Sequence, residues 1–277
     1  MKLLNLGCGK TYNDSWVNVD FVSTGPGVLA HNLLQGIPFP DSSFDVVYHS
    51  HVLEHFDAVG ARNLVSECFR VLKSNGVIRL AVPNLEILAR EYLQVLDAVA
   101  SGDSAREIDY DWVMLELYDQ VARTKPGGEM ACFIAALAEE NREFVRCRAG
   151  AEAENFWMPK RDLHGINRLK FLLNKFLGVI SLKRIRQKIA GWIVYLIAGK
   201  AAFKSFKMGI FRSSGEIHQW MYDRYSLKRL LENAGFVDVK ICSANESCIP
   251  EFENYQLDVV NNKVRKPDSI YVEAYKP

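Results

Sequence analysis

The sequence predicts an α/β fold, with a mostly parallel sheet and a large helical insertion. Near both ends of the chain, short apolar segments suited to buried strands alternate with segments of helical periodicity. This alternation is typical of a parallel sheet that is covered by helices on both faces. The first apolar segment runs into the turn Gly7-Cys8-Gly9, and the middle of the chain has helical periodicity without strand patterns.

The N-terminal third supplies four predicted strands and one helix. Apolar residues from Ala58 to Lys73 recur at helical spacing, and Asn75-Gly76 then predicts a left-handed stop to that helix. The strands are predicted at residues 2–6, 16–21, 44–48 and 77–82.

The C-terminal part returns to the same pattern. Ser226 is predicted to cap a helix that stops at Gly235, and two strands follow at residues 237–242 and 269–275. Between the two parts, helices are expected within residues 87–99, 110–121 and 130–145. A structureless loop of that length is rare. We therefore predict a core formed by residues 1–84 and 213–277, and a helical cap formed by residues 85–212.

Composition describes a globular chain whose charge is unevenly distributed. The 277 residues carry a formal net charge of +1. Residues 160–212 hold thirteen Lys or Arg and one acid, Asp162, which leaves the rest of the chain with a net charge of −11. A local concentration of charge affects a binding partner more than the average does.

The cysteines indicate the redox state of the thiols and whether a metal site is expected, and the N-terminus indicates the cellular location. The six cysteines are scattered without C-x-x-C or Cys/His ligand spacing, so we expect reduced thiols and no metal site. The chain begins directly with a predicted strand, which leaves no room for a signal peptide. The apolar run from Ile189 to Gly199 is shorter than a membrane span of about 20 residues. A cytoplasmic protein is expected.

The Gly7-Cys8-Gly9 turn and Asp20 predict a nucleoside site. Ligands of α/β sheets bind beyond the carboxyl ends of the strands, and a glycine there lets the backbone approach the ligand. Asp20 ends the second strand, where a carboxylate can accept hydrogen bonds from ribose hydroxyls; alternatively, it caps the following turn. A dinucleotide fingerprint would need a third glycine at the position of Tyr12, so NAD and FAD are disfavoured.

Several motifs together resemble the class I S-adenosylmethionine (SAM)-dependent methyltransferases of the type 11 methyltransferase-domain family. The resemblance covers roughly residues 1–84 and 216–277 and does not extend over the insertion. It rests on LNLGCG (residues 4–9), WVNVD (16–20), PFPDSSFDVV (38–47), HSHVLEH (49–55), VLKSNGV (71–77) and LLENAGF (230–236).

The resemblance implies a Rossmann-like sheet of seven strands, one of them antiparallel near an edge, with SAM across the strand tips and S-adenosylhomocysteine as product. It places the methionine end of SAM near Gly7 and Gly9 and the ribose near Asp20. Two departures concern Asn5 and Asn32, where the family often has an acidic residue. The cofactor-binding residues implied by the motifs are Asn5, Gly7, Cys8, Gly9, Asp20, Asn32, Leu33, Ser50 and His51.

Methyl transfer from a sulfonium mainly needs alignment and a dry site, but a hydroxyl acceptor also needs a base. His218, His51 and His55 are the candidates, since neutral imidazole is available near pH 7. His218 is favoured because it lies where the chain returns from the insertion to the sheet. Alternatively, His55 is a helix-end residue and His218 a surface residue beside Trp220.

Residues 171–199 mix apolar and basic side chains, which is typical of a helix in a membrane interface. A cap helix with a solvated basic face explains the same pattern. The apolar content of this segment favours contact with lipid or protein over contact with nucleic acid. The same content is compatible with an oligomer.

Three functions are weighed. The leading one is SAM-dependent O-methylation of a sugar or small metabolite, with an acceptor that is small or lipid-linked. The second is a catalytically silent SAM-fold adaptor that binds a membrane or protein partner through the insertion. The third, an RNA methyltransferase, lacks a recognisable RNA-binding appendage.

Overall fold

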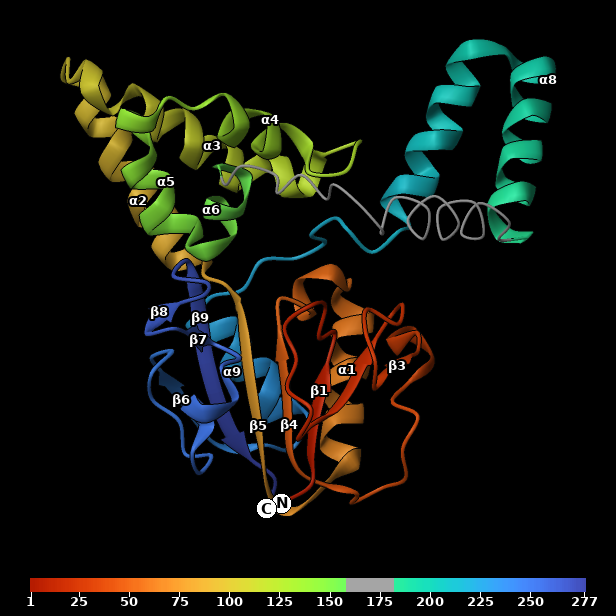
Figure 1. Ribbon diagram of the computed structural model, residues 1–277, viewed down its shortest axis with the longest axis vertical. Coiled ribbons are helices and arrows are strands. Elements are labelled where there is room, and N and C mark those ends of the chain that lie inside the picture. The colour runs from red at the N-terminus through yellow and green to blue at the C-terminus, as the bar shows by residue number, and fades with distance from the viewer. Residues whose placement is uncertain (158–181) are drawn as a thin grey trace, which may run out of the picture. The chain divides into compact units, whose positions relative to one another are not determined.

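A computed structural model describes residues 1–157 and 182–277 (Figure 1). They belong to two compact units. The first unit comprises Met1–Arg123, Gly127–Phe156 and Ile217–Pro277, and the second comprises Thr124–Pro126 and Trp157–Glu216. The first unit thus contains both the sheet and residues 85–123, which the sequence analysis placed in the cap. The predicted core and cap boundaries stay predictions.

The first unit is built on a seven-stranded sheet in the order β3-β2-β1-β4-β5-β9-β6. All pairings among the first five are parallel, and β9 is antiparallel to both of its neighbours. The predicted fold class, including an antiparallel strand next to an edge, is confirmed. The order reverses between β1 and β4, which is where ligands of such sheets bind. The strands are β1 (Leu3–Leu6), β2 (Val17–Asp20), β3 (Val28–Ala30), β4 (Phe44–Ser50), β5 (Leu72–Pro83), β6 (Val237–Cys242) and β9 (Ser269–Tyr275), and a separate two-stranded ribbon consists of β7 (Val259–Val260) and β8 (Lys263–Val264).

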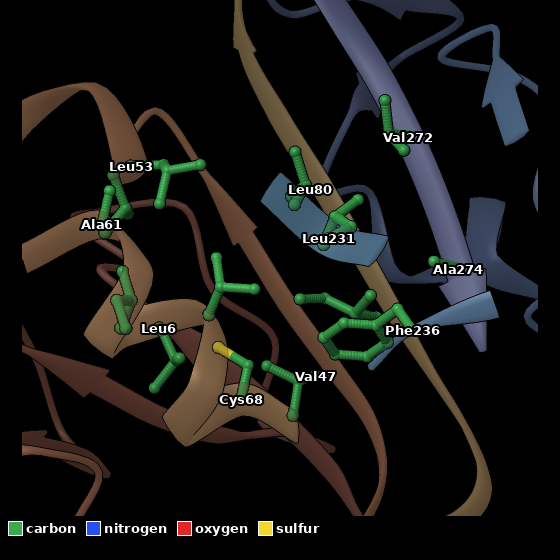
Figure 2. Close-up of a cluster of buried hydrophobic side chains, with 14 of the residues drawn as sticks. Leu6, Val47, Leu53, Ala61, Cys68, Leu80, Leu231, Phe236, Val272 and Ala274 are labelled. Carbon is green, nitrogen blue, oxygen red and sulfur yellow. The ribbon is translucent and has the colours of Figure 1, made fainter. Parts of the chain in front are cut away.

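Two helices and the sheet form the main hydrophobic core. Helices α1 (Ala58–Val71) and α9 (Arg224–Asn233) bury Leu64, Cys68 and Leu231 against strand residues such as Val47 and Leu80, and Figure 2 shows part of this cluster. Burial of apolar side chains stabilises the fold by roughly 25 cal/mol per Å² removed from water. This core fixes the strand tips that carry the candidate site.

A second cluster forms around the indole of Trp16. Tyr48 and Phe252 pack edge-on or tilted against this ring and each other, with ring centroids 5.7–6.4 Å apart. Phe252 belongs to the short 3-10 helix η5 (Phe252–Tyr255). The segment that connects β6 to the β7–β8 ribbon is thereby anchored to β4.

Two predicted helix ends are wrong in detail. Helix α1 ends at Val71, and β5 begins at Leu72, so the turn with Asn75 at φ +61° interrupts the strand rather than stopping the helix. Asp223, not Ser226, caps α9. Its carboxylate accepts from the backbone N–H groups of Tyr225 and Ser226, and the Ser226 hydroxyl accepts from the Asp223 N–H. The two residues form a capping box, in which Ser226 is the partner of the cap.

The described part of the insertion is helical, as predicted. The predicted helix over residues 130–145 is two helices, because the chain turns after Ala136 and restarts at Arg142. The helices are α2 (Leu85–Ala100), α3 (Glu107–Ala122), α4 (Gly128–Ala136), α5 (Arg142–Ala149), α6 (Ala151–Trp157) and α8 (Leu182–Arg212), and short 3-10 turns are η1 (Leu33–Gln35), η2 (Leu53–His55), η3 (Ser104–Arg106) and η4 (Glu139–Asn141).

Helix α8 of the second unit is a helical hairpin. Gly199 has the non-helical angles φ 80° and ψ −174°, and Figure 1 shows the two limbs (turquoise) side by side. The rings of Tyr195 and Phe203 pack edge to face at 5.9 Å, and a Cβ on Gly191 would lie 2.9 Å from Phe203. The limbs are therefore antiparallel and in contact. Residues 171–181 of the predicted basic segment lie outside the described residues.

Candidate functional site at the strand tips

A cavity of about 570 Å³ lies at the carboxyl ends of β1 and β4, in the first unit. Its size falls within the range of about 300–1,000 Å³ that small-molecule sites occupy. We call it the strand-tip pocket. It is lined by Asn5, Gly7, Cys8, Gly9, Lys10, Thr11, Tyr48, Ser50, His51, Phe156, Val260, Arg265 and Lys266. Six of these are residues that the sequence predicted for the cofactor: Asn5, Gly7, Cys8, Gly9, Ser50 and His51. A larger cavity of about 840 Å³, within residues 244–262, is lined by none of the predicted residues among those described.

The two glycines in the turn after β1 are required for different structural reasons. Both have positive φ, +61° at Gly7 and +56° at Gly9, which favours glycine. A Cβ on Gly7 would lie 2.3 Å from Cγ2 of Val52, so this glycine allows the β4 end to pack against the turn. A Cβ on Gly9 would meet no atom of the described residues within 4 Å. Only Gly9 therefore leaves open space at the pocket.

Asp20 secures this turn. One of its carboxylate oxygens accepts a hydrogen bond of 2.8 Å from the Gly9 N–H, and the other accepts one of 3.3 Å from the Val22 N–H. Asp20 thus lies beside the glycine turn without lining the pocket. Its predicted contact with a ribose stays a prediction. Burial, together with the nearby charge of Asp20, raises the pKa of the Cys8 thiol to about 11, so Cys8 is a neutral wall residue at pH 7.

Asn5 and Asn32 are the two departures from the family pattern, and the side chain of each makes a hydrogen bond within the protein. The Asn5 side chain is buried and donates to Asn18 Oδ1 at 3.1 Å. Asn32 caps η1 by accepting a 3.1 Å hydrogen bond from the Leu34 N–H. Leu33 packs against the main core. Among the described residues, the pocket lining does not include Asn32 or Leu33, and their adenine contact stays a prediction.

The three candidate histidines lie around one buried carboxylate, Glu54. His51 Nδ1 is 3.2 Å and His218 Nε2 is 4.0 Å from Glu54 Oε1. The rings of His55 and His218 stack edge to face, 4.9 Å between centroids. The carboxylate is fully buried. Burial alone would raise the pKa of Glu54, but the three imidazoles outweigh it and lower that pKa to about 2.

His51 alone of the three lines the strand-tip pocket, as far as the described residues show. Its Nε2 lies 2.7 Å from Ser269 Oγ, and its backbone has φ +55°, a conformation that is strained for a non-glycine residue. His218 is 8% exposed, and burial lowers its pKa to about 3. The preference for His218 over His51, which came from its place at the return of the chain, has less geometric support than the sequence indicated.

Arg265 and Lys266 are pocket residues that the sequence analysis missed. The β7–β8 ribbon, whose turn residues Asn261 and Asn262 both have positive φ as two-residue hairpins require, presents them to the β4 end. Arg265 Nη2 donates to Ser50 Oγ at 2.9 Å, and its Nε donates to the Leu257 carbonyl at 2.8 Å. The pair Asn261-Asn262 was the available signal for this ribbon.

Comparisons with known proteins agree on one family. Residues 10–80 match the family model described as a methyltransferase domain. A segment of 56 residues is 43% identical to a protein of Mycolicibacterium smegmatis named as a probable SAM-dependent methyltransferase. This match covers 20% of the present chain and 21% of the mycobacterial protein, so the chain spans about a fifth of the length of that curated relative.

Two solved structures are similar over nearly the whole chain. A SAM-dependent methyltransferase from Archaeoglobus fulgidus is 14% identical, with a TM-score of 0.38 over 99% of this chain and 86% of its own. One from Thermotoga maritima is 12% identical, with a TM-score of 0.40 over 100% of this chain and 82% of its own. At these scores the overlays carry no argument about function.

Proposed function

Residues 10–80 of this chain are a methyltransferase domain of the SAM-dependent class, and from this premise we propose that the protein methylates an oxygen atom of a lipid-linked sugar or related metabolite. The observation that carries the proposal is the strand-tip pocket, where the open face of Gly9 and the side chain of His51 line one cavity. A silent adaptor would have no need of such a cavity.

The pocket residues fit SAM, which this family of enzymes uses. When bound, SAM supplies a methyl group on a positively charged sulfur, ready for in-line displacement. Gly9 leaves the backbone open to the cofactor, and Lys10, Arg265 and Lys266 supply positive charge for its carboxylate. Asp20 holds the glycine turn and is the acceptor we propose for the ribose hydroxyls.

His51 is the side chain that we propose takes the proton of the acceptor hydroxyl. Its Nδ1 lies 3.2 Å from Glu54 Oε1, close enough for this carboxylate to stabilise the imidazolium that forms when Nε2 takes a proton. Nε2 lies 2.7 Å from the Ser269 hydroxyl oxygen in the resting protein. An acceptor hydroxyl that replaces Ser269 at Nε2 would find a base whose protonated form is stabilised by a nearby buried carboxylate.

Radioactive methyl transfer tests the enzymatic part. The full chain is incubated with SAM labelled on the methyl group and a bacterial lipid extract, and label is counted in the chloroform-soluble and aqueous fractions. We expect label in the lipid fraction, and a loss of methyl transfer of about 100-fold in His51→Gln at saturating SAM. The control His31→Gln changes a histidine outside the pocket and should transfer normally. SAM binding without transfer to either fraction would support the adaptor instead.

The hairpin of α8 supports a lipid-linked acceptor. Within residues Ile185–Arg212, a window of 18 residues has the apolar composition of a membrane-embedded helix, and only 6% of that window is buried. At the end of the hairpin, Leu196 is 71% and Ile197 82% exposed, and Trp192 is 68% exposed beside them. Apolar surface of this kind is costly in water and marks a contact with lipid or protein.

The kink at Gly199 favours insertion into one leaflet over a full span. The first limb, residues 182–198, is about 25 Å long and the second, residues 200–212, about 20 Å. A hydrocarbon core is about 30 Å thick, so neither limb crosses it alone. The limbs carry Arg186, Lys188, Lys204 and Lys207 on exposed positions and no acidic residue. Positive charge beside an apolar end complements an anionic lipid surface.

Vesicle flotation tests the membrane part. We expect the protein to float with phosphatidylcholine vesicles that contain about 30 mol% phosphatidylglycerol, and to be released by about 0.5 M salt. Leu196→Asp with Ile197→Asp should abolish binding. Leu34→Asp, at a 73% exposed leucine elsewhere, is the matched control and should still float. A wild-type protein that never floats, but whose oligomeric state changes in the double variant, would mean that a second copy covers this surface.

A further inference from the structure

A group of potential metal ligands lies behind the strand-tip pocket. One ligand atom from each of Glu54, His55 and His218 lies within 4.8 Å of the others. Glu54 and His55 belong to the 3-10 turn η2 directly after β4, and His218 comes from the segment that follows the insertion. The three residues are buried or half-buried, unlike the exposed acidic clusters that commonly occur without a ligand.

The carboxylate of Glu54 is buried without a hydrogen bond in the described part of the chain. It is 0% exposed, and neither oxygen has a hydrogen-bond partner among residues 1–157 and 182–277. The His51 contact at 3.2 Å is close, but it is not aligned as a hydrogen bond. Neutral imidazoles do not balance the negative charge of a buried carboxylate, and a bound cation would do so.

His55 has the second contact that metal-binding imidazoles usually make. Its Nδ1–H donates to the Ile217 carbonyl at 3.0 Å, which leaves the lone pair on Nε2. Imidazoles that bind metals almost always donate their other N–H to a carbonyl or carboxylate, which fixes the tautomer.

Backbone hydrogen bonds hold the three ligands together without a metal. The Gln219 N–H donates to the Glu54 carbonyl at 2.7 Å, and the Gln219 side chain donates to the His55 carbonyl at 2.8 Å. The His218 N–H donates to the Gln120 carbonyl at 3.0 Å. The segment that carries His218 is therefore fixed on η2, which reduces the ordering cost of binding an ion.

We propose that Glu54, His55 and His218 bind a divalent transition-metal ion of the Zn²⁺ type. Two imidazoles and one carboxylate suit Zn²⁺ and leave a fourth position open, whereas Mg²⁺ and Ca²⁺ prefer oxygen ligands. Ligand atoms about 2.0–2.1 Å from a tetrahedral ion lie roughly 3.4 Å apart, so atoms now up to 4.8 Å apart would approach each other by up to about 1.4 Å on binding. This site goes beyond the proposed methyl transfer and needs no SAM. We did not expect it from the sequence, where its ligands come from segments 163 positions apart.

Metal titration of the full chain, after dialysis against EDTA, tests the site. We expect one equivalent of Zn²⁺ by calorimetry, a visible absorption band with Co²⁺, and a rise in melting temperature of about 5 °C or more at a hundredfold excess over the dissociation constant. His55→Gln and His218→Gln should each weaken binding at least tenfold, while the control His31→Gln should bind as the wild type does. Absence of stoichiometric binding, or an equal loss in His31→Gln, overturns the proposal.

Glu54→Gln keeps the test decisive if a histidine variant fails to fold. It should weaken Zn²⁺ binding at least tenfold, because a neutral amide is a much poorer ligand for the ion than a carboxylate. Wild-type Zn²⁺ affinity in a folded Glu54→Gln variant would mean that Glu54 is not a ligand, and the metal site fails. SAM binding, measured in the same samples, separates this outcome from a failure of the proposed methyltransferase.

Discussion

Arg79 Nε donates to Asp258 Oδ2 at 2.8 Å, across 179 positions of the chain, and both side chains are at most 1% exposed. The same guanidinium donates to Glu273 Oε1 at 2.7 Å and to the Glu246 carbonyl at 2.8 Å. The second oxygen of Asp258 accepts from the Tyr48 hydroxyl at 2.5 Å. These hydrogen bonds hold the segment before the β7–β8 ribbon against the centre of the sheet. Arg265, which follows this ribbon, is thereby positioned at the pocket.

Arg79→Met should therefore destabilise the protein strongly. Removing one partner of a buried ion pair leaves an uncompensated charge and costs about 3–5 kcal/mol. Arg90→Met is the matched control, because Arg90 pairs with Glu86 on an exposed helix face and is 74% exposed. Its expected cost is about 0.5 kcal/mol or less. Urea unfolding of both variants measures the difference, and similar losses would contradict the role given to Arg79.

The environment of the Glu273 carboxylate should make the stability of the protein sensitive to acid. Burial alone would raise its pKa, but hydrogen bonds from the Cys248 N–H, the Ser247 hydroxyl and Arg79 outweigh burial and hold the pKa below the usual 4.5. A carboxyl whose pKa is lower in the folded protein stabilises it above the unfolded pKa, and this contribution is lost as the pH falls through the folded pKa.

Accordingly, the unfolding free energy should decline below pH 4.5 more steeply in the wild-type protein than in Glu273→Gln. Glu232→Gln, at a 50% exposed carboxylate that lies 3.7 Å from Lys228, should leave the steepness unchanged. Equal pH profiles for the wild-type protein and Glu273→Gln would show that the carboxylate is not held in its ionised form.

Sequence reasoning located the sheet and the glycine turn because these features depend on local patterns. The alternation of strands and helices determines the sheet type, and a glycine at a strand tip indicates that the backbone approaches a ligand closely. The approach of His218 to Glu54 and of Asp258 to Arg79 could not be predicted, because each contact joins segments more than 160 positions apart. Arg265 was missed for a similar reason: a two-stranded ribbon outside the main sheet carries it to Ser50. The end of α1 was misplaced because Leu72 has no local feature that stops a helix.

The ribose contact predicted for Asp20 can be measured by titration calorimetry. Asp20→Ala should weaken the binding of SAM and of S-adenosylhomocysteine by about 1.5–3 kcal/mol, which is the contribution of a hydrogen bond to a charged group. Asp20→Asn should lose less, since an amide oxygen can still accept from the Gly9 N–H. Asp14→Ala removes an exposed carboxylate of the segment between β1 and β2 and serves as the control. Unchanged affinity in Asp20→Ala would place the nucleoside elsewhere.

The different environments of the glycines predict three separable effects. Gly7, Gly9 and Gly27 all have positive φ, so an alanine at any of them costs about 1–2 kcal/mol of backbone strain. Gly27→Ala should show only this strain, since its Cβ would meet nothing within 4 Å of the described chain. Gly7→Ala should cost more, because its Cβ would collide with Val52.

Gly9→Ala is the informative variant for the pocket. It should match Gly27→Ala in stability, because its Cβ also points into open space, yet it should bind SAM at least tenfold more weakly because that space belongs to the strand-tip pocket. Urea unfolding gives the first quantity and calorimetry the second. If Gly9→Ala and Gly27→Ala bind SAM equally well, the cofactor does not approach the β1 turn, and the strand-tip pocket serves another ligand.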